Sequence, residues 1–261
     1  MVLPGFMGGE LGYRLLRWLG GRAAAETRCT GGVYARQSKL ESLFGAGIWE
    51  AAVTDKVVLD FGCGLGREVI EMAEHGARRA IGLDSQQKML DIAARDARQS
   101  SASERCVFAT RTGEKFDAIF SIDGFEHYGE PEQILRAMRE AIRPGGRVFI
   151  SFGPPWLHPR GGHLFSVFPW AHLIFTERAL MRWRSDFKSD GATRFGEVEG
   201  GLNRMTVRRF ERVVAASAFE VESFEAVPIK RLRRFFTPLT REFLTSIVRC
   251  TLRPRPAMEP T

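Results

Sequence analysis

The chain has 261 residues, 44% of them hydrophobic and 26% charged, and its 38 Lys and Arg against 31 Asp and Glu give a net charge of +7. This is the composition of a globular protein with one sizeable core. No apolar run reaches the roughly 18 residues that cross a bilayer. The four cysteines include no Cys-x-x-Cys pair, which argues against a disulfide framework or a zinc cluster. No secretory signal is apparent, so we expect a cytoplasmic protein, with peripheral contact to a membrane left open.

Residues 1–55 are predicted to form a helical cap. The apolar residues between Leu11 and Leu19, with Arg14 and Arg17 among them, predict an amphipathic helix. Such a helix could lie on a membrane surface, although packing on the next domain is its more common use.

After the cap, short buried-type strands alternate with amphipathic helices. The first helix ends at Gly76, Ser85 is expected to cap the second, and Pro131 fits the first turn of a later one. This alternation predicts an α/β fold with a doubly wound, mostly parallel, Rossmann-like sheet of seven strands. The strands are predicted over residues 57–61, 80–83, 106–109, 118–122, 147–152, 219–227 and 247–252.

The alternation stops after the fifth strand. Residues 153–205, called the lid segment below, are predicted to form a lid inserted into a domain of residues 56–253. Thr206 is expected to cap the helix that resumes the fold. Residues 254–261 are predicted to be a flexible tail.

The carboxyl-terminal part is strongly basic. Eight basic residues and one acid stand between Lys230 and Arg255. Such a patch suits an anionic partner, which could be a lipid surface, a phosphorylated substrate or nucleic acid. The alternative is a solvated face, and it is favoured if Arg249 and Arg253 lie at the edge of the sheet.

A glycine-rich turn follows the first strand. It reads Asp60-x-Gly62-x-Gly64-x-Gly66, a spacing that differs from the GxGxxG of dinucleotide enzymes. The glycines let the backbone approach a ligand at the carboxyl edge of the sheet. Asp60 could pair with a cationic group, and Asp84 could accept hydrogen bonds from both hydroxyls of a ribose. The implied ligand has a ribose, a positive charge and no pyrophosphate; alternatively, the two acids only cap turns.

With these features the sequence resembles the class I S-adenosylmethionine-dependent methyltransferases, and most of all the small-molecule and ubiquinone-type O-methyltransferases. The resemblance rests on four motifs in the family's order: VVLDFGCGLG (57–66), GLDSQQKML (82–90), FDAIFSIDGFEH (116–127) and RPGGRVFIS (143–151). One departure is the short stretch ATRTGEKF, where many relatives carry an acid that contacts the adenine amino group.

The resemblance implies S-adenosyl-L-methionine as the cofactor and assigns residues to each of its parts. These residues are Asp60, Gly62, Cys63 and Gly64 at the amino-acid end, Asp84 at the ribose, Ser85 and Met89 beside the adenine, and Ile122 and Asp123 under the sulfonium.

The end of the fourth strand offers a general base. Methyl transfer from a sulfonium is an in-line displacement, and a hydroxyl nucleophile must lose its proton. His127 is the first candidate, with Glu126 and Asp123 as catalytic neighbours; alternatively, His127 is bonded to backbone at a helix start. Asp123-x-x-Glu126-His127 also resembles the Glu-x-x-Glu-His metal cluster of ubiquinone-type methyltransferases, so the three could bind Mg²⁺ or Zn²⁺.

Three of the five histidines lie in the lid segment, which starts at the ligand-binding edge of the sheet. Gly161-Gly162 allows a turn that could bring His158 and His163 together. The alternative is that the aromatic residues form a lid core, as we expect for most of them and for His172. The residues predicted to face the substrate are Trp156, His158, His163 and Trp170.

The predicted function is O-methylation of a small-molecule, lipid-linked or glycan-precursor acceptor. A catalytically silent S-adenosylmethionine-binding protein is the alternative, and the GxGxG spacing disfavours an NAD-dependent oxidoreductase. Gly153-Pro154-Pro155-Trp156 looks like the motif of nucleobase methyltransferases, but it follows strand five instead of strand four. Nucleic acid is therefore disfavoured as a substrate. The sequence leaves the oligomeric state open.

Overall fold

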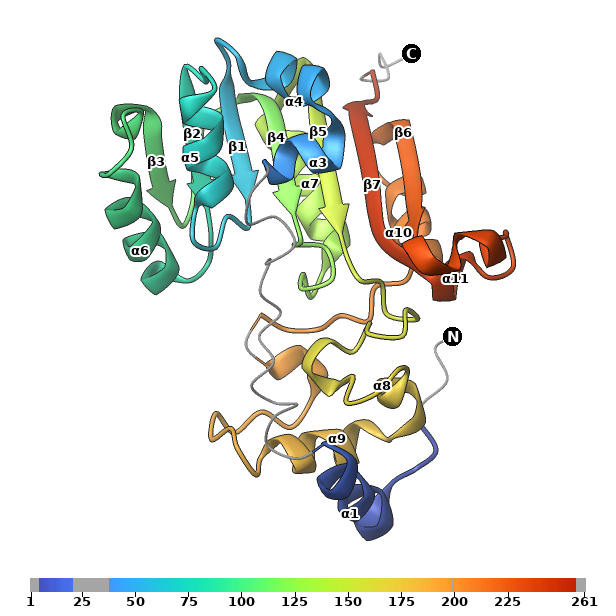
Figure 1. Cartoon of the computed structure of the whole chain (residues 1–261). Coiled ribbons are helices and arrows are strands. Elements are labelled where there is room, and N and C mark those ends of the chain that lie inside the picture. The colour runs from blue at the N-terminus through green and yellow to red at the C-terminus, as the bar shows by residue number, and fades with distance from the viewer. Residues whose placement is uncertain (1–4, 21–37, 199, 257–261) are drawn as a thin grey trace, which may run out of the picture.

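A seven-stranded sheet organises the chain, for which a computed structural model describes residues 5–20, 38–198 and 200–256. The strand order is β3-β2-β1-β4-β5-β7-β6; β1 to β5 run parallel, and β7 is antiparallel to both of its neighbours (Figure 1). The predicted doubly wound, mostly parallel sheet is confirmed. The strands are β1 (Val57–Phe61), β2 (Arg79–Leu83), β3 (Cys106–Ala109), β4 (Phe116–Ile122), β5 (Ile142–Phe152), β6 (Phe219–Pro228) and β7 (Thr245–Pro254).

Helices cover both faces of the sheet, because parallel strands such as β1 and β4 bury apolar side chains on both sides. Helices α7 and α10 form a core with one face, and α3 to α6 form a second core with the other. Pro131 starts α7, and Thr206 Oγ1 caps α10 by accepting a hydrogen bond from the Arg209 amide. These helices are α3 (Lys39–Phe44), α4 (Ala46–Val53), α5 (Arg67–Glu74), α6 (Gln87–Ala97), α7 (Pro131–Ala141) and α10 (Val207–Ala215).

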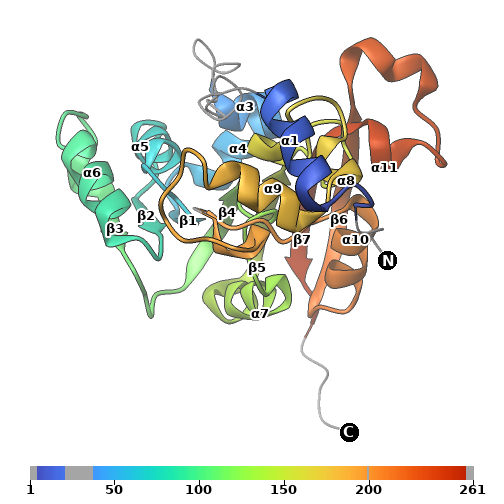
Figure 2. The ribbon, with the colours of Figure 1, turned by 90° about the horizontal axis from the view of Figure 1, so that it is seen from below.

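A third hydrophobic core lies beyond the carboxyl ends of the parallel strands (Figure 1, Figure 2). It joins the lid segment, with α8 (Ala171–Ile174) and α9 (Glu177–Arg184), to α1 (Gly9–Gly20). The predicted cap is thereby divided between two cores, because α3 and α4 pack on the sheet; its residues 1–4 and 21–37 lie outside the described residues. No helix in the described part of the chain is long and apolar enough to cross a membrane.

The predicted cap of α6 is wrong. The helix begins after Gln86, not Ser85, and the Gln86 amide donates to Asp84 Oδ1 at 2.9 Å. The aspartate can take this amide because it stands directly at the end of β2. Asp84 therefore fixes the start of α6 as well as the end of the strand.

Arg249 and Arg253 do not lie at the edge of the sheet, which was the condition that favoured a solvated face. β7 lies between β5 and β6, so β6 is the edge strand. On β7, Arg249 pairs with Glu225 at 2.6 Å and Arg253 with Glu220 at 2.7 Å, both across to β6. The strand continues through Pro254, so the expected tail begins inside the sheet; residues 257–261 of that tail lie outside the described residues.

Candidate functional site

The glycine-rich turn after β1 is shaped by left-handed backbone and by Asp84. Gly62 and Gly64 have φ values of 81° and 49°, which favour glycine. The Gly62 amide donates to the Leu83 carbonyl at 2.8 Å, and the Gly64 amide donates to Asp84 Oδ2 at 2.9 Å. A Cβ placed on Gly64 would meet no atom within 4 Å beyond its chain neighbours. The turn therefore presents bare backbone to open space at the carboxyl end of β1.

Asp60, just before this turn, is a buried acid with an unsatisfied oxygen. Asp60 is only 2% exposed, and its Oδ1 has no hydrogen-bond partner among the described residues. Burial and then the nearby Glu68 carboxylate raise the pKa of Asp60 well above its ordinary value, while Lys39 opposes the shift. Leaving a buried carboxyl oxygen unpaired is costly, and a cationic ligand group would relieve that cost.

Two residues that the sequence analysis missed complete this charged site. Lys39 of α3 places Nζ 2.7 Å from Asp123 Oδ2 and 3.3 Å from Glu68 Oε1. Burial lowers the pKa of Lys39, but the two carboxylates outweigh burial and the net shift is upward. Glu68 had a local signal, because it follows the glycine turn at the start of a helix. Lys39 had none, because it stands far upstream of the motif and arrives only through the packing of α3.

Tyr128 holds the ends of β1 and β4 together through its hydroxyl group. Its hydroxyl donates to the Phe61 carbonyl at 2.7 Å and lies 2.9 Å from Ser121 Oγ. A Cβ at Gly62 or at Gly124 would come within 2.6 Å or 2.4 Å of that hydroxyl oxygen. Glycine is therefore required at both places, so that the ends of β1 and β4 can close over the ring.

We expect Tyr128→Phe to lower the free energy of unfolding by about 1 kcal/mol, because the carbonyl of the half-buried Phe61 and the hydroxyl of the buried Ser121 lose a shared partner. Urea unfolding measures the loss. Ser121→Ala and the double variant form the control cycle, in which coupled hydroxyls give losses that do not add. Additive losses, or an unchanged midpoint for Tyr128→Phe, would contradict this network.

The turn after β4 is tied to both ends of the lid segment. Glu126 is 4% exposed, and its Oε1 accepts a hydrogen bond from the Gly153 amide at 3.0 Å. Burial and then the Asp123 carboxylate raise the pKa of Glu126 to about 8. From the far end of the segment, Asn203 Nδ2 donates to the Phe125 carbonyl at 2.6 Å. The carboxyl group of Glu126 thus connects two parts of the backbone.

His127 contacts the lid segment through a hydrogen bond and through a ring contact. Its Nδ1 is 2.7 Å from the Gly201 carbonyl oxygen, which can only accept, so Nδ1 carries a proton and Nε2 is the acceptor of the neutral ring. The His163 ring lies 5.4 Å from the His127 ring, centroid to centroid. Burial and then His127 lower the pKa of His163 to about 4, which keeps that neighbour neutral.

The three candidate metal ligands do not form a ligand set. Asp123, Glu126 and His127 are engaged with an ammonium group, a backbone amide and a backbone carbonyl, respectively. No group of three or more His, Cys, Asp or Glu side chains in the described part of the chain is placed to hold a metal ion. The residues therefore do not fit a divalent metal.

The four predicted substrate residues have separate surroundings. Trp156 is 3% exposed and packs inside the third hydrophobic core, with its ring 4.8 Å from that of His172, centroid to centroid. Trp170 donates through Nε1 to a backbone carbonyl of the same segment, and His158 Nδ1 accepts a backbone amide. Only His163 has a ring contact with the turn after β4, and that contact is with His127. Trp156 is therefore a residue of the third hydrophobic core, because its ring is buried among the other residues of that core.

The fold is that of the Rossmann-like methyltransferases. Residues 58–146 match the family described as "Methyltransferase domain". Among solved structures, an S-adenosylmethionine-dependent methyltransferase from Mesorhizobium loti is similar with a TM-score of 0.52 at 18% identity, covering 81% of this chain and 99% of that one. The [4+2]-cyclase SpnF is similar with a TM-score of 0.53 at 16% identity, covering 80% of each chain. These similarities show the fold.

Curated relatives extend the similarity to sequence. The ubiquinone biosynthesis O-methyltransferase of Chromobacterium violaceum is 36% identical over 107 residues, which are 39% of this chain and 46% of the relative. That of Aeromonas salmonicida is 35% identical over 105 residues, 37% of this chain and 42% of the relative. The matched part spans less than half the length of these relatives. The predicted resemblance to class I S-adenosylmethionine-dependent methyltransferases is confirmed, over residues 58–146 in the family match.

Proposed function

We propose that the protein is an S-adenosylmethionine-dependent methyltransferase that acts on a hydroxyl group of a small-molecule or lipid-linked acceptor. The observation that carries this proposal is the buried Oδ1 of Asp60, which has no hydrogen-bond partner among the described residues and lies beside an open glycine turn. Glu68, Asp84 and Asp123 add their negative charge to the same place. Lys39 is the cation that the structure pairs with two of these acids, and a ligand with a sulfonium and an ammonium group would supply further positive charge.

The residues at the site fit the parts of this cofactor. Asp84 is fixed in place because each of its oxygens accepts a backbone amide at 2.9 Å, and their remaining lone pairs are free for the ribose hydroxyls. Ser85 and the half-buried Met89 are the proposed neighbours of the adenine, and Lys39 offers a cation to the cofactor carboxylate. The proposed lining of the amino-acid end and the sulfonium is Asp60, Gly62, Cys63, Gly64, Ile122 and Asp123.

His127 is the proposed general base. When bound, the cofactor presents an electrophilic methyl group, and the acceptor hydroxyl must lose its proton as it attacks. The bond from Nδ1 to the Gly201 carbonyl fixes the ring and leaves Nε2 able to take that proton. His163 is proposed to hold the opposite side of the acceptor site. Glu126, buried and bonded to Gly153, is proposed as a positioning residue.

We expect His127→Ala to lower kcat about 100-fold or more, because it removes the base, and to leave the affinity for S-adenosylhomocysteine unchanged. Added imidazole should restore part of the rate, a response that a purely structural histidine would not give. His75→Ala, which changes an exposed histidine at the end of α5, is the matched control. His163→Ala should also reduce turnover with unchanged cofactor affinity. Full activity of His127→Ala would remove it from the mechanism.

The proposal is tested with S-adenosylmethionine that carries a labelled methyl group. The protein is incubated with it and a cell extract, which is then separated into lipid, polymer and small-molecule fractions. Label in one fraction identifies the acceptor class, and activity that survives exhaustive chelation agrees with the lack of a metal ligand set. Cofactor binding without label in any fraction would instead favour the catalytically silent binding protein.

A further inference from the structure

Helix α1 exposes an apolar face that its own packing does not use. Leu11, Trp18 and Leu19 are 74%, 79% and 43% exposed. With Leu15, which is itself half-buried against the third core, they follow the i, i+4, i+7, i+8 spacing of a single helix face. The adjacent face is buried against the third core through Gly12, Leu16 and Gly20. An exposed tryptophan within a row of leucines is typical of a helix that lies in a membrane interface.

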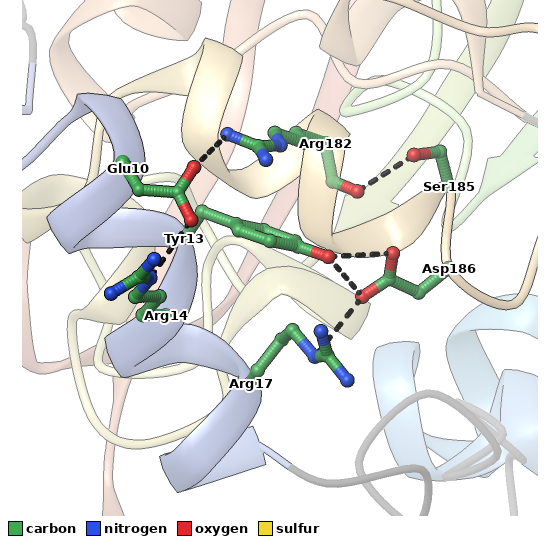
Figure 3. A network of polar contacts seen from close by, with 7 residues as sticks. All are labelled: Glu10, Tyr13, Arg14, Arg17, Arg182, Ser185 and Asp186. Carbon is green, nitrogen blue, oxygen red and sulfur yellow. Dashed lines mark hydrogen bonds and ion pairs between the residues drawn. The ribbon is translucent and has the colours of Figure 1, made fainter.

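Polar contacts with α9 and with Asp186, which follows it, fix this orientation of the helix. The Tyr13 hydroxyl donates to Asp186 at 3.0 Å, and the Arg182 guanidinium lies 3.9 Å over the Tyr13 ring (Figure 3). Arg182 also donates to Glu10 at 2.8 Å. Rotating α1 to bury Trp18 would break all of these contacts, so the apolar face is held outward.

A second element combines exposed apolar tips with unpaired positive charge. It is segment 229–244, which joins β6 to β7 and contains a 3₁₀ helix (Lys230–Phe235) and α11 (Arg241–Leu244). Leu239, Phe235 and Phe243 are 86%, 51% and 42% exposed. Four basic residues that stand beside them are exposed and form no ion pair with any described carboxylate: Lys230, Arg231, Arg233 and Arg234.

The charge of this segment is therefore unlike that of the neighbouring sheet. Arg249 and Arg253 on β7 are neutralised by glutamates of β6, and Arg241 pairs with Glu211. The excess positive charge of the carboxyl-terminal part is left on segment 229–244, next to its apolar tips.

Both elements lie on the side of the molecule where the parallel strands end (Figure 1, Figure 2). This is also the side on which Asp60, Asp84 and His127 gather.

We propose that α1 and segment 229–244 together dock the protein on an anionic lipid surface. Lipid phosphates attract the four unpaired cations, at about 1 kcal/mol for each basic residue near such a surface, and the exposed Leu, Phe and Trp side chains enter the interface. Trp18 and Phe235 could stack on bases, but nucleic acid fits less well, because the aliphatic Leu11 and Leu239, at 74% and 86% exposed, would gain nothing from stacking. A second copy of the chain fits less well, because its segment 229–244 carries the same positive charge. The proposal deepens the proposed function by favouring a lipid-linked acceptor.

The test uses Trp18 as a natural probe, because it is the one tryptophan of the described residues with an exposed side chain. The full chain is mixed with phosphatidylcholine vesicles that contain no phosphatidylglycerol or about 30% of it. We expect sedimentation with the anionic vesicles only, and a shift of the tryptophan emission to shorter wavelength that Trp18→Phe abolishes. No cofactor or acceptor is present, so failure here is separate from failure of methyl transfer.

Charge-reversed variants complete the test. Replacing Arg231, Arg233 and Arg234 with Glu should lower vesicle partitioning at least tenfold, because each basic residue near an anionic surface contributes about 1 kcal/mol of attraction. The matched control reverses three exposed arginines elsewhere, in the variant Arg98→Glu/Arg136→Glu/Arg212→Glu, and circular dichroism checks that both variants fold. Equal losses in the two variants, binding to neutral vesicles, or no binding would overturn the proposal. A short RNA is the last comparison. If the wild-type protein and the control variant bound it and the first variant did not, that result would also overturn the proposal, in favour of nucleic acid.

Discussion

Replacing Asp84 with Asn should weaken binding of S-adenosylhomocysteine by about 100-fold or more, which corresponds to about 2.8 kcal/mol. The carboxylate accepts the Gly64 amide through Oδ2 and the Gln86 amide through Oδ1. Asparagine keeps the size of the side chain but turns one acceptor into a donor, which then faces a backbone N–H. The proposed ribose also loses hydrogen bonds to a charged group, each contributing about 1.5–3 kcal/mol.

Calorimetric titration with S-adenosylhomocysteine measures this loss. Asp91→Asn is the matched control, because Asp91 is an exposed acid on α6 whose described hydrogen bond is to Gln87 on the same helix. That variant should bind the ligand as the wild-type protein does. If Asp84→Asn bound within about threefold of the wild type, a difference of less than about 0.7 kcal/mol, Asp84 would be only a turn residue.

Replacing Glu126 with Gln should remove a loss of stability that the wild-type protein suffers as the pH rises. The pKa of Glu126 is about 8 in the folded protein, against an ordinary value of 4.5, because of burial and then the Asp123 carboxylate. Between these two values the folded state holds a proton that the unfolded state has released. The stabilisation that the protonated Glu126 carboxyl gives the wild-type protein is therefore fully present below about pH 4.5. It falls as the pH rises and is fully lost above about pH 8.

At about 1.4 kcal/mol for each pKa unit, this loss can reach about 5 kcal/mol. Glutamine resembles the protonated acid and can still accept the hydrogen bond from Gly153, so it should show no such decline. Urea unfolding at about pH 5 and about pH 9 tests this, and the stability advantage of Glu126→Gln over the wild type should grow toward the higher pH. Glu104→Gln, at an exposed position, is the control. Parallel pH profiles for the wild type and Glu126→Gln would show that Glu126 is ionised throughout.

The two predictions concern residues that the sequence analysis named for similar reasons, yet their surroundings differ. Asp84 is half-buried and bonded by two amides that come from its own strand end and the adjacent turn. Glu126 is buried and has one oxygen without a described partner. Burial is a property of the packed molecule, and it changes Glu126 from a candidate catalytic carboxylate into a neutral group that connects the turn after β4 to the lid segment.

The sequence by itself determined the sheet and the glycine turn, because these depend on neighbours within a few residues. Alternating apolar strands and helices predicted all seven strands, and the Asp60-x-Gly62-x-Gly64 spacing placed the candidate cofactor site at the end of β1. Periodicity and local turn chemistry carry this information without reference to distant residues.

Only the tertiary structure decided which distant groups meet. It brought Lys39 to Asp123, His163 to His127 and α1 to α9, and it placed β7 inside the sheet, where its arginines pair with glutamates of β6. Such contacts depend on the packing of complete elements and on charge in a partly buried environment, which no local pattern encodes. The same packing left Trp18 and the four cations of segment 229–244 exposed, and so defined the surface proposed to meet the membrane.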